Sequence, residues 1–537
     1  MEIAQVIAII VIVLEVVLLN FEFKRDVMMF QQNSYRPERY MRWLRQSGDS
    51  TSATRLIAIF IVLFCLAGFG LQFVALICAG VYALWMSVVL ARRKYKKPLV
   101  LTKRACRLMA VNYLLTALVV ILAIFGSVYG LFGKVLPWYT ACVTLLVIYC
   151  LSHYIIICSN FVLKPVESKI NRKFYVNAQN KLNSLKDLKI IGITGSYGKT
   201  STKHYLCRIL SEQMETLMTP GSYNTTLGVV RTINEYLKPY HQAFIVEMGA
   251  KQNGDIKEIC DLVHPSMGII TSVGPQHLET FGTIENVRDT KFELVDALPS
   301  DGYAILNNDY PIIADRKVEN CTAIRYSCSE ENPGADYVAT DIKYNSDGTS
   351  FRIKCPDGKY LDFETKLLGE YNIANLTAAI IIALTLGLDV DKIKYSVGRI
   401  ESVEHRLSLK RMGNGVTLLD DAFNSNPAGA SMAVNVLSNM TTGRRIIITP
   451  GMIELGEKQY ELNFELGRHI AQKGIDYAAV VGNYNKEALT AGMKEGNMDD
   501  EHILHFDTFL DANAWMVAFT APGDVVLIEN DLPDTFK

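Results

Sequence analysis

Long uncharged apolar runs dominate the first 163 of the 537 residues. They form four blocks, at roughly 3–21, 56–91, 108–133 and 135–163. A helix that crosses a bilayer needs about 20 apolar residues, so each block is long enough to form a membrane-spanning helix. The first block contains Glu15 and lacks both a basic stretch before it and a small-residue cleavage site after it. This pattern favours a retained span over a signal peptide.

The block from Leu56 to Ala91 is too long for one upright helix. As a single helix it would extend about 54 Å, against a hydrocarbon core of about 30 Å. The flanking segments 24–55 and 91–107 are both rich in Lys and Arg, and such segments stay on the cytoplasmic side. A hairpin near Gly68–Gln72 keeps both basic segments on the cytoplasmic side. One tilted span instead sends one of these segments outside and places the amino terminus on the opposite side of the membrane. We therefore expect about five membrane helices, an external amino terminus and a cytoplasmic carboxy-terminal half.

Charge divides the chain at the same place. Residues 1–163 hold 16 basic and 6 acidic side chains, and residues 164–537 hold 38 and 49. The overall formal charge of -1 is therefore the sum of +10 and -11. This balance argues against a strongly basic nucleic-acid-binding protein. The 11 cysteines include no C-x-x-C pair, which argues against a zinc ribbon or a disulfide scaffold.

After a polar linker at 166–187, the pattern changes to short apolar strands that alternate with helical segments. Such alternation is typical of α/β domains built on a mostly parallel sheet. A second series of strands starts near residue 401. We expect a transmembrane domain over 1–165, a first α/β domain over 188–400 and a Rossmann-like domain over 401–537.

The first strand of this half leads into a glycine-rich turn and then a helix that reaches about Ser211. The turn consists of Thr194, Gly195, Ser196, Tyr197, Gly198, Lys199, Thr200 and Ser201. In such a loop, backbone N–H groups face a phosphate, the lysine neutralises the β- and γ-phosphates, and the hydroxyl ligates Mg²⁺. Ile193 stands where the general pattern has its first glycine. The order of strand, turn and helix still predicts a site for ATP and Mg²⁺.

Further motifs follow this loop in a fixed order. They are Ser222–Val229, Val246–Ala250, Thr271–Leu278, Ile284–Val287 before Lys291, Gly369–Asn375, Asp420–Pro427 and Gly451–Gly456. With T-G-S-x-G-K-T-S, they resemble the Mur ligase family, whose members build the peptidoglycan stem peptide one amide at a time. The likeness covers about residues 188–528 and is greatest to the branch that adds D-alanyl-D-alanine.

This resemblance implies an ATP-dependent carboxylate–amine ligase that works through an acyl phosphate. It implies a muropeptide-like carboxylate acceptor and an amine such as D-Ala-D-Ala. It also gives roles to side chains outside the loop. Glu247, which ends one apolar strand, and His277, which follows another, correspond to metal ligands, together with Thr200 and Lys291. Lys199, His277 and Lys291 are the expected catalytic residues, and Lys291 matches a lysine that many members carry as a carbamate.

Other nucleotide contacts are implied in the same way. Asn308 corresponds to a residue near the adenine, and Arg406 to one that reaches the phosphates. Asp421 and Asn424 correspond to contacts with the ribose and neighbouring groups. Uncatalysed carbamate formation at Lys291 needs the neutral amine, whereas an ordinary lysine has a pKa near 10.4.

The sequence departs from the family at three places. Apolar spans stand where soluble members begin with a domain that binds the UDP end of the acceptor. Glu529-Asn530-Asp531 occupies a position where the D-alanyl-D-alanine branch often reads Lys-Gly-Ser, and Tyr371 precedes Asn372 where relatives often carry histidine. These differences leave both substrates open.

Two alternatives therefore remain beside the D-Ala-D-Ala-adding activity. One is a ligase that joins another amine to another carboxylate, including a lipid-linked one, since basic loops attract anionic headgroups. The other is a non-catalytic, nucleotide-binding membrane scaffold. An ATP-driven pump fits less well, because the chain has no ABC-type signature. In each case we expect a multi-pass protein of the bacterial cytoplasmic membrane, with membrane lipids as partners.

Overall fold

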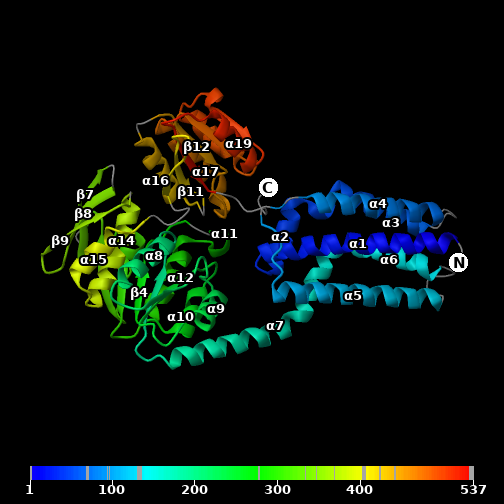
Figure 1. Cartoon of the computed structure of the whole chain (residues 1–537), viewed down its shortest axis with the longest axis horizontal. Coiled ribbons are helices and arrows are strands. Elements are labelled where there is room, and N and C mark those ends of the chain that lie inside the picture. Colours follow the sequence, from blue (N-terminus) through cyan, green and yellow to red (C-terminus); the bar gives the residue numbers. More distant parts are fainter. Residues whose placement is uncertain are drawn as a thin grey trace. The chain divides into compact units, whose positions relative to one another are not determined.

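A computed structural model describes residues 3–530, except 68–71, 94, 96, 130–135, 276–277, 330, 333, 346–347, 368, 402–406, 423–424 and 441–442. The described residues form two compact units, one up to Ile170 and one from Asn171 onward (Figure 1). The first is helical, and the second contains two β-sheets. Each unit is described by itself.

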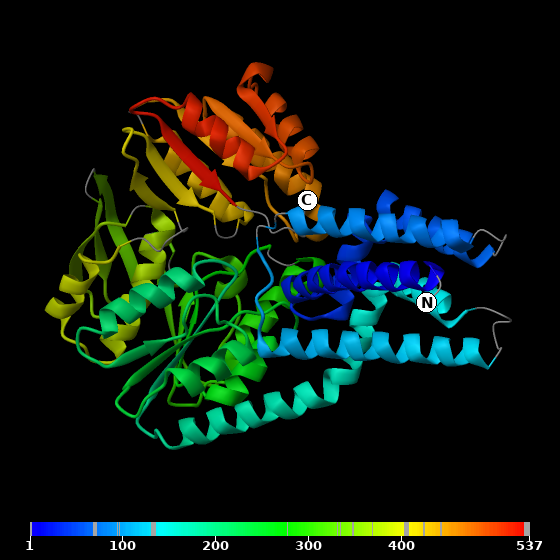
Figure 2. The ribbon, with the colours of Figure 1, turned by 45° about the vertical axis from the view of Figure 1, so that its right-hand side comes forward.

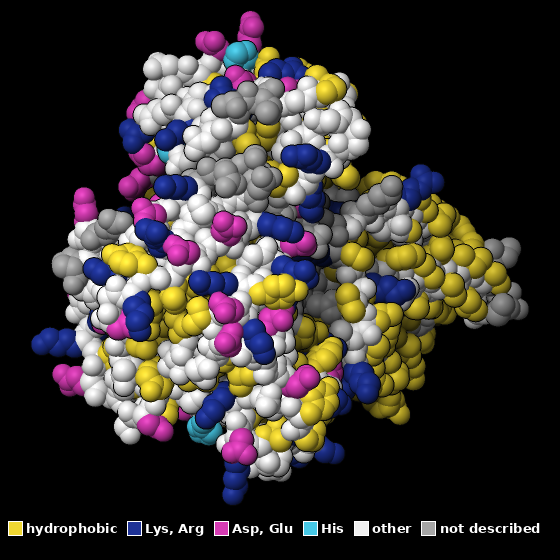
Figure 3. Space-filling model, turned by 60° about the vertical axis from the view of Figure 1, so that its left-hand side comes forward, with side chains coloured by type: hydrophobic (Ala, Val, Ile, Leu, Met, Phe, Trp, Pro, Cys, Tyr) yellow, Lys and Arg dark blue, Asp and Glu magenta, His cyan; other side chains and the backbone are white. Residues whose placement is uncertain are grey.

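The first unit is built from helices that pack side by side (Figure 2). They are α1 (Ile3–Gln32), α2 (Pro37–Ser47), α3 (Ala53–Ala67), α4 (Gln72–Arg92), α5 (Lys103–Val128), α6 (Pro137–Cys150) and α7 (Ser152–Asn183), with the short 3₁₀ turn η1 (Asp49–Thr51) before α3. Helices α1, α5 and α4 are long and apolar enough to cross a membrane. Figure 3 shows hydrophobic side chains over the surface of this unit, where Phe60, Leu114 and Phe161 are among the exposed ones.

The long block at 56–91 is divided between α3 and α4, so the interpretation as one tilted helix is wrong. The Tyr82 hydroxyl of α4 donates to the Thr54 carbonyl at 2.9 Å, beside the start of α3. The middle of α4 thus lies against the start of α3, so the two helices run side by side, as in the predicted hairpin. The predicted turn at Gly68–Leu71 lies outside the described residues, and α4 begins at Gln72.

In the part of the chain that the structure describes, fewer helices than the predicted five are long and apolar enough to cross a membrane. Helices α6 and α7 are bent by 81° at Leu151, and they count as one broken span at most. Helix α3 has 15 residues and extends about 22 Å, less than the thickness of a hydrocarbon core. Among the described residues, three helices are therefore long and apolar enough to cross a membrane, or up to four with the bent pair.

The segment predicted as a polar linker is mostly helical. Helix α7 continues through Pro165 as far as Asn183. Ala178 and Leu182, near its end, are buried in the core of the second unit. The polar composition of 166–187 thus belongs to the exposed side of a helix.

The first sheet of the second unit follows the order β2-β3-β1-β4-β5-β6-β7-β8-β9. Its strands are β1 (Lys189–Thr194), β2 (Thr216–Met218), β3 (Ala243–Glu247), β4 (Met267–Ile270), β5 (Tyr303–Asn307), β6 (Thr322–Ser327), β7 (Tyr337–Asn345), β8 (Gly348–Lys354) and β9 (Tyr360–Thr365). Pairing is parallel from β2 to β7 and antiparallel from β7 to β9. The predicted parallel α/β sheet is confirmed.

Helices cover both faces of this sheet. They are α8 (Lys199–Leu210), α9 (Thr226–Glu235), α10 (Asp255–Val263), α11 (Leu278–Phe281), α12 (Ile284–Asp296), α13 (Pro311–Ala314), α14 (Glu370–Thr385) and α15 (Val390–Val397). Helices α8, α14 and α15 share one core with the sheet, and α9, α10 and α12 share the other. Parallel strands buried on both faces read as continuous apolar runs, as Ile190–Ile193 does here.

The second sheet has the order β10-β11-β15-β12-β13-β14. Its strands are β10 (Ser408–Arg411), β11 (Thr417–Asp421), β12 (Arg445–Thr449), β13 (Tyr477–Val481), β14 (Ile503–Phe506) and β15 (Val525–Glu529), and its helices are α16 (Pro427–Ser438), α17 (Gln459–Gln472), α18 (Lys486–Glu495) and α19 (Phe509–Phe519). The 3₁₀ turns η2 (Gly456–Lys458) and η3 (Asp500–His502) precede α17 and β14. Helices α16, α17 and α18 pack on one face and α19 on the other. This arrangement confirms the predicted second α/β domain.

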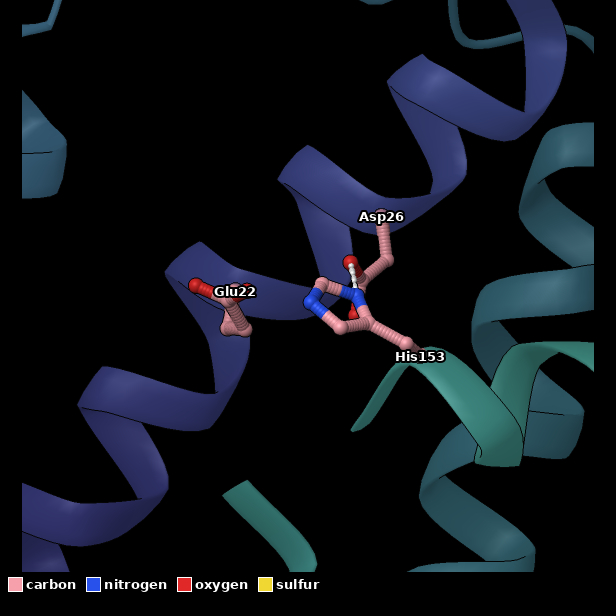
Figure 4. A group of neighbouring side chains, drawn as sticks. All are labelled: Glu22, Asp26 and His153. Atoms are coloured by element: carbon pink, nitrogen blue, oxygen red, sulfur yellow. Dashed lines mark hydrogen bonds and ion pairs between the residues drawn. The ribbon is translucent and has the colours of Figure 1, made fainter. Parts of the chain in front are cut away.

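Ionisable side chains meet inside the first unit, on α1, α2, η1 and α7. His153 Nδ1 lies 2.7 Å from Asp26 Oδ1, and the Tyr40 hydroxyl donates to the same oxygen at 3.0 Å. His153 Nε2 lies 3.0 Å from Asp49 Oδ2. Figure 4 shows the imidazole beside Asp26, with Glu22 one helical turn away along α1. His153 and Asp26 are fully enclosed.

Two arginines complete this network. Arg25 donates to Glu22 at 2.9 Å and also to Asp49. Arg55 donates to Glu22 and, at 2.6 Å, to the Tyr149 carbonyl near the end of α6. Arg55 therefore bonds both a buried carboxylate and a backbone carbonyl in the last turn of α6, next to the bend before α7.

Glu22, Asp26 and His153 each offer a ligand atom, and these atoms lie within 4.8 Å of one another, as in metal sites. The two guanidinium groups on Glu22 argue against a metal ion. The three carboxylates already pair with two arginines and His153, so an added dication would compete with partners that are in place. We therefore interpret the group as an ion-pair network that fixes α1, α3 and α7 to one another.

Loss of Arg55 is expected to destabilise the first unit. Removing one partner of a buried ion pair typically costs about 3–5 kcal/mol, because the other charge stays buried. Arg55→Ala should therefore lower the melting temperature of the detergent-solubilised chain by several degrees. Arg45→Ala is the matched control, because Arg45 is exposed on α2. Equal melting temperatures for the two variants would contradict the assigned role of the network.

Candidate functional site

The glycine-rich turn lies between β1 and α8, and two of its positions exclude any side chain. A Cβ on Gly195 would lie 2.1 Å from the Thr271 hydroxyl, and one on Gly198 would lie 2.3 Å from the Asn375 side-chain oxygen. Gly198 also has φ +80°, in the left-handed region that favours glycine. The backbone of the turn is therefore pressed against the loop after β4 and against α14.

Side-chain and backbone hydrogen bonds hold the turn in place. The Thr194 hydroxyl donates to the Met248 carbonyl at 3.0 Å, and the Ser196 hydroxyl donates to the Gly274 carbonyl at 3.1 Å. The Ser196 N–H donates to the Ser272 carbonyl at 2.8 Å. The buried Ser201 lies in the first turn of α8. These contacts fix the loop before any ligand arrives.

Helix α8 begins with its amide groups available to an anion. Its N-cap is Gly198, which has no side chain to cap the helix. The first N–H groups of a helix have no partner within it and carry the positive end of its dipole. A phosphate is the ligand that such a terminus binds best.

Lys199 and Thr200 are the first two residues of α8. The Lys199 ammonium donates to the carbonyls of Gly195 at 2.6 Å and Ser196 at 3.1 Å, so it bends back over the turn. The Thr200 hydroxyl donates to Glu247 Oε1 at 3.2 Å. The hydroxyl and the carboxylate are oxygen ligands of the kind that Mg²⁺ takes beside a polyphosphate. The side chains thus fit the predicted ATP and Mg²⁺ site.

Glu247 is the centre of the polar contacts around the turn. It ends β3 and is 2% exposed. Its carboxylate accepts hydrogen bonds from Thr200 and, at 3.2 Å, from Asn224, and it pairs with Lys203 at 2.8 Å. Burial raises the pKa of Glu247, but Lys203 and then Lys199 outweigh it, so the pKa lies below the ordinary value. Glu247 is therefore an anion at neutral pH.

Lys203 is a site residue that the sequence reasoning missed. It lies one turn after Lys199 on α8, is completely buried, and also donates to the Gly221 carbonyl at 2.7 Å. Its position four residues after Lys199, on the same helix face, is a signal that could have identified it. Lys203 connects α8 to β3 and to the loop that carries Asn224.

Lys291 lies on α12 and is 2% exposed. Burial, followed by the charge of Lys199, lowers the pKa of Lys291 to about 7, although Glu293 and Asp255 act in the opposite direction. An appreciable fraction of this lysine is therefore neutral at physiological pH. This is the property that uncatalysed carbamate formation requires, and it arises from burial that the local sequence does not reveal.

The remaining predicted residues are only partly described. Asn308 is buried, donates to the Asn332 side chain at 2.6 Å and accepts from Arg325 at 3.1 Å. Asp421 ends β11 in the second sheet, where its carboxylate accepts the Leu407 N–H at 3.1 Å. His277, Arg406 and Asn424 lie outside the described residues. The structure thus brings the glycine-rich turn, Thr200, Glu247 and Lys203 into one site. Lys291 lies close enough for the charge of Lys199 to lower its pKa.

Similar curated proteins share one name. The chain is 33% identical over 310 residues to the UDP-N-acetylmuramoyl-tripeptide–D-alanyl-D-alanine ligase of Escherichia coli, which corresponds to 56% of this chain and 66% of the relative. It is 25% identical over 342 residues to the ligase of that name in Bacillus subtilis, which covers 64% of this chain and 72% of the relative. The chain therefore spans about two thirds of the length of these relatives.

Solved structures of that ligase have the same fold. The MurF ligase of Thermotoga maritima in complex with ADP superposes with a TM-score of 0.60 at 24% identity, over 67% of this chain and 80% of that one. MurF of Acinetobacter baumannii gives a TM-score of 0.59 at 26% identity, over 67% and 77%.

Lys203→Met tests the buried ion pair of the site. It leaves the Glu247 carboxylate buried without its ammonium partner, at an expected cost of about 3–5 kcal/mol at pH 7.5. The pKa of Glu247 is lowered in the folded chain, so the pair stabilises above the ordinary carboxyl pKa and loses its effect as pH falls through the folded value. In Lys203→Met the unpaired, buried Glu247 takes up a proton at higher pH than in wild type, which removes the cost of the buried charge, so the loss of melting temperature should shrink between pH 7.5 and pH 4.

The matched control is Lys257→Met, because the ammonium of Lys257 pairs with Asp261 on the exposed face of α10. We expect that change to shift stability by about 0.5 kcal/mol or less at either pH. A loss in Lys203→Met that is no larger than in the control would show that Lys203 does not hold Glu247.

Two family models match the second unit. The Mur ligase middle domain matches residues 193–383, and the Mur ligase glutamate ligase domain matches residues 405–529, together more than half of the chain. The first includes the glycine-rich turn, Glu247 and Lys291, and the second includes Asp421. The phosphate-binding geometry of the turn agrees with these matches, and the chain belongs to the Mur ligase family.

Proposed function

We propose that this chain is an ATP-dependent carboxylate–amine ligase that extends a peptidoglycan precursor, with D-Ala-D-Ala as the preferred amine. The observation that carries the proposal is the rigid glycine-rich turn at the start of α8, with Lys199 over it and Thr200 in contact with Glu247. Its similarity to ligases named for D-Ala-D-Ala addition supports the choice of substrates.

Amide formation needs an activated carboxylate, because a carboxylate oxygen is a poor leaving group. The substrate carboxylate attacks the γ-phosphorus of ATP, the bond from that phosphorus to the β,γ-bridging oxygen breaks, and ADP leaves. The amine then attacks the acyl carbon of the acyl phosphate, loses a proton and displaces inorganic phosphate. The α8 amides and Lys199 hold the phosphates in line for the first step.

Bound Mg²⁺ supplies positive charge to the phosphate oxygens. Thr200 and Glu247 are the described residues that would hold it. Lys203 keeps the Glu247 carboxylate ionised and oriented, because it pairs with it at 2.8 Å. The depressed pKa of Lys291 suits conversion of its neutral amine to a carbamate by carbon dioxide. That product is an anion, which would provide a further oxygen ligand.

The membrane-compatible helices support a location at the bacterial cytoplasmic membrane. Three described helices are long and apolar enough to span it, and the flanking segments are rich in basic residues. These features motivate a second candidate substrate, a lipid-linked muropeptide carboxylate, beside the soluble nucleotide precursor. Phosphate release with each acceptor separates the two, because turnover of the soluble precursor equal to that of the lipid-linked one would remove the second candidate.

Lys199→Ala should strongly reduce the proposed activity. Loss of one preorganised charge at a transferred phosphoryl group typically reduces kcat by about 10²–10³. The measurement is phosphate release from ATP by the full chain in detergent, with D-Ala-D-Ala and either acceptor. Lys257→Ala is the control and should retain wild-type turnover. Undiminished turnover by Lys199→Ala would reject this site as the catalytic one.

Lys291→Ala tests the carbamate. The variant should lose most of its turnover and recover part of it when a short carboxylic acid is added, because the acid replaces the missing anion. Added amine of similar size, such as methylamine, is the control and should restore nothing. Full activity of Lys291→Ala without any additive would exclude Lys291 from the mechanism.

A further inference from the structure

Glu529 is a completely buried carboxylate at the carboxyl end of β15. It pairs in register with Asp421, the last residue of β11, and Thr449 ends β12 on the other side of β15. Ligands of open α/β sheets bind at this edge, where the strands end. None of the roles assigned above uses Glu529.

Two hydroxyl groups donate to Glu529. The Thr449 hydroxyl reaches one carboxylate oxygen at 2.5 Å, and the Ser425 hydroxyl reaches the other. Thr449 also accepts the Gly451 N–H at 2.9 Å, so its hydroxyl proton is committed to Glu529. Ser425 differs from Thr449, because its side chain is only half-buried and can meet a ligand.

The ionised form of Glu529 is unfavourable for the fold. Burial raises the pKa of Glu529 to about 7, and the charge of Asp421 adds to this, although the two hydroxyl groups act in the opposite direction. Among the described residues, Asp421 is the titratable group that faces Glu529. The other two contacts, from Thr449 on β12 and from Ser425 in the loop after β11, are hydroxyl groups. A carboxylate kept where its charge lowers stability points to a use for that charge.

A hydroxyl group has one proton to donate and lone pairs to accept. While Glu529 is ionised, the Ser425 proton is directed to it, and Ser425 presents only lone pairs to its exposed side. When Glu529 is protonated, the new O–H donates to Ser425, whose own proton must then turn outward. The protonation state of Glu529 therefore decides whether Ser425 accepts or donates a hydrogen bond.

We propose that Ser425 accepts a hydrogen bond from the ammonium or amine group of the incoming co-substrate, and that ionised Glu529 behind it makes this position selective for a cationic amine. Glu529 is a positioning residue, since it acts through Ser425. The inference rests on the proposed ligase function, because it assigns a recognition site to the amine of that reaction.

The test is steady-state kinetics of the full chain in detergent, with each substrate varied in turn. In Glu529→Gln and in Ser425→Ala, KM for the amine should rise at least tenfold at pH 7.5, while KM for ATP and for the carboxylate changes less than twofold. The double variant should be no worse than either single one, because the two residues act as a unit. Ser425→Thr keeps the hydroxyl group and should restore most of the amine affinity.

The pH profile separates this role from a purely structural one. Wild-type kcat/KM for the amine should fall as pH drops below about 7, the pKa of Glu529. That limb should be shallower in Glu529→Gln, because Lys291, whose pKa is also about 7, is then the titrating group that remains. Because ionised Glu529 destabilises the fold, the melting temperature of Glu529→Gln relative to wild type should rise between pH 5 and pH 8. Glu487→Gln, on the exposed face of α18, is the matched control and should match wild type throughout.

Two results would overturn the inference while the ligase proposal stands. One is an unchanged KM for the amine in Glu529→Gln, and the other is an equal rise of all three KM values with an acidic limb as steep as that of wild type. Failure of the ligase proposal has a different signature, because wild-type protein would then release no phosphate with any amine and acceptor, and the inference would fall with it.

Discussion

The buried ion pair between Lys203 and Glu247 is the constraint on which the catalytic half depends. Glu247 is an anion where β3 ends, next to the glycine-rich turn, yet its side chain is almost sealed from water. An unpaired carboxylate there would take up a proton. Lys203 prevents this, and since it also holds the Gly221 carbonyl, the same ammonium fixes the loop that brings Asn224 to Glu247.

The helical unit follows the same rule with different residues. Glu22, Asp26 and Asp49 are buried or nearly so, and each has a cationic or hydrogen-bonding partner from another segment. Buried charges are tolerated when paired, and they then specify which helices meet. The network lies beside the bend before α7, the helix whose far end is buried in the second unit. It therefore fixes the start of the helix that links the two halves of the chain.

Burial also changes the chemistry of two titratable groups. It lowers the pKa of Lys291 and raises that of Glu529, and both values come to about 7. The neutral forms of a lysine and a carboxylic acid thus become accessible at physiological pH. For Lys291 this permits reaction with carbon dioxide, and for Glu529 it makes the direction of the Ser425 hydrogen bond depend on pH. The same desolvation serves two different steps of one proposed reaction.

The sequence by itself determined the order of domains, the strands around the turn and the phosphate loop, because apolar periodicity and the residues of a tight turn act locally. It also singled out Glu247 and Lys291 as candidates, through the family resemblance that the ordered motifs carry. It did not determine the 15-residue length of α3, the helix over 166–183 or the pairing of Lys203 with Glu247. Those features depend on which residues, distant along the chain, become buried together. Charge pairing and desolvation exist only after that burial, so the tertiary structure alone decided them.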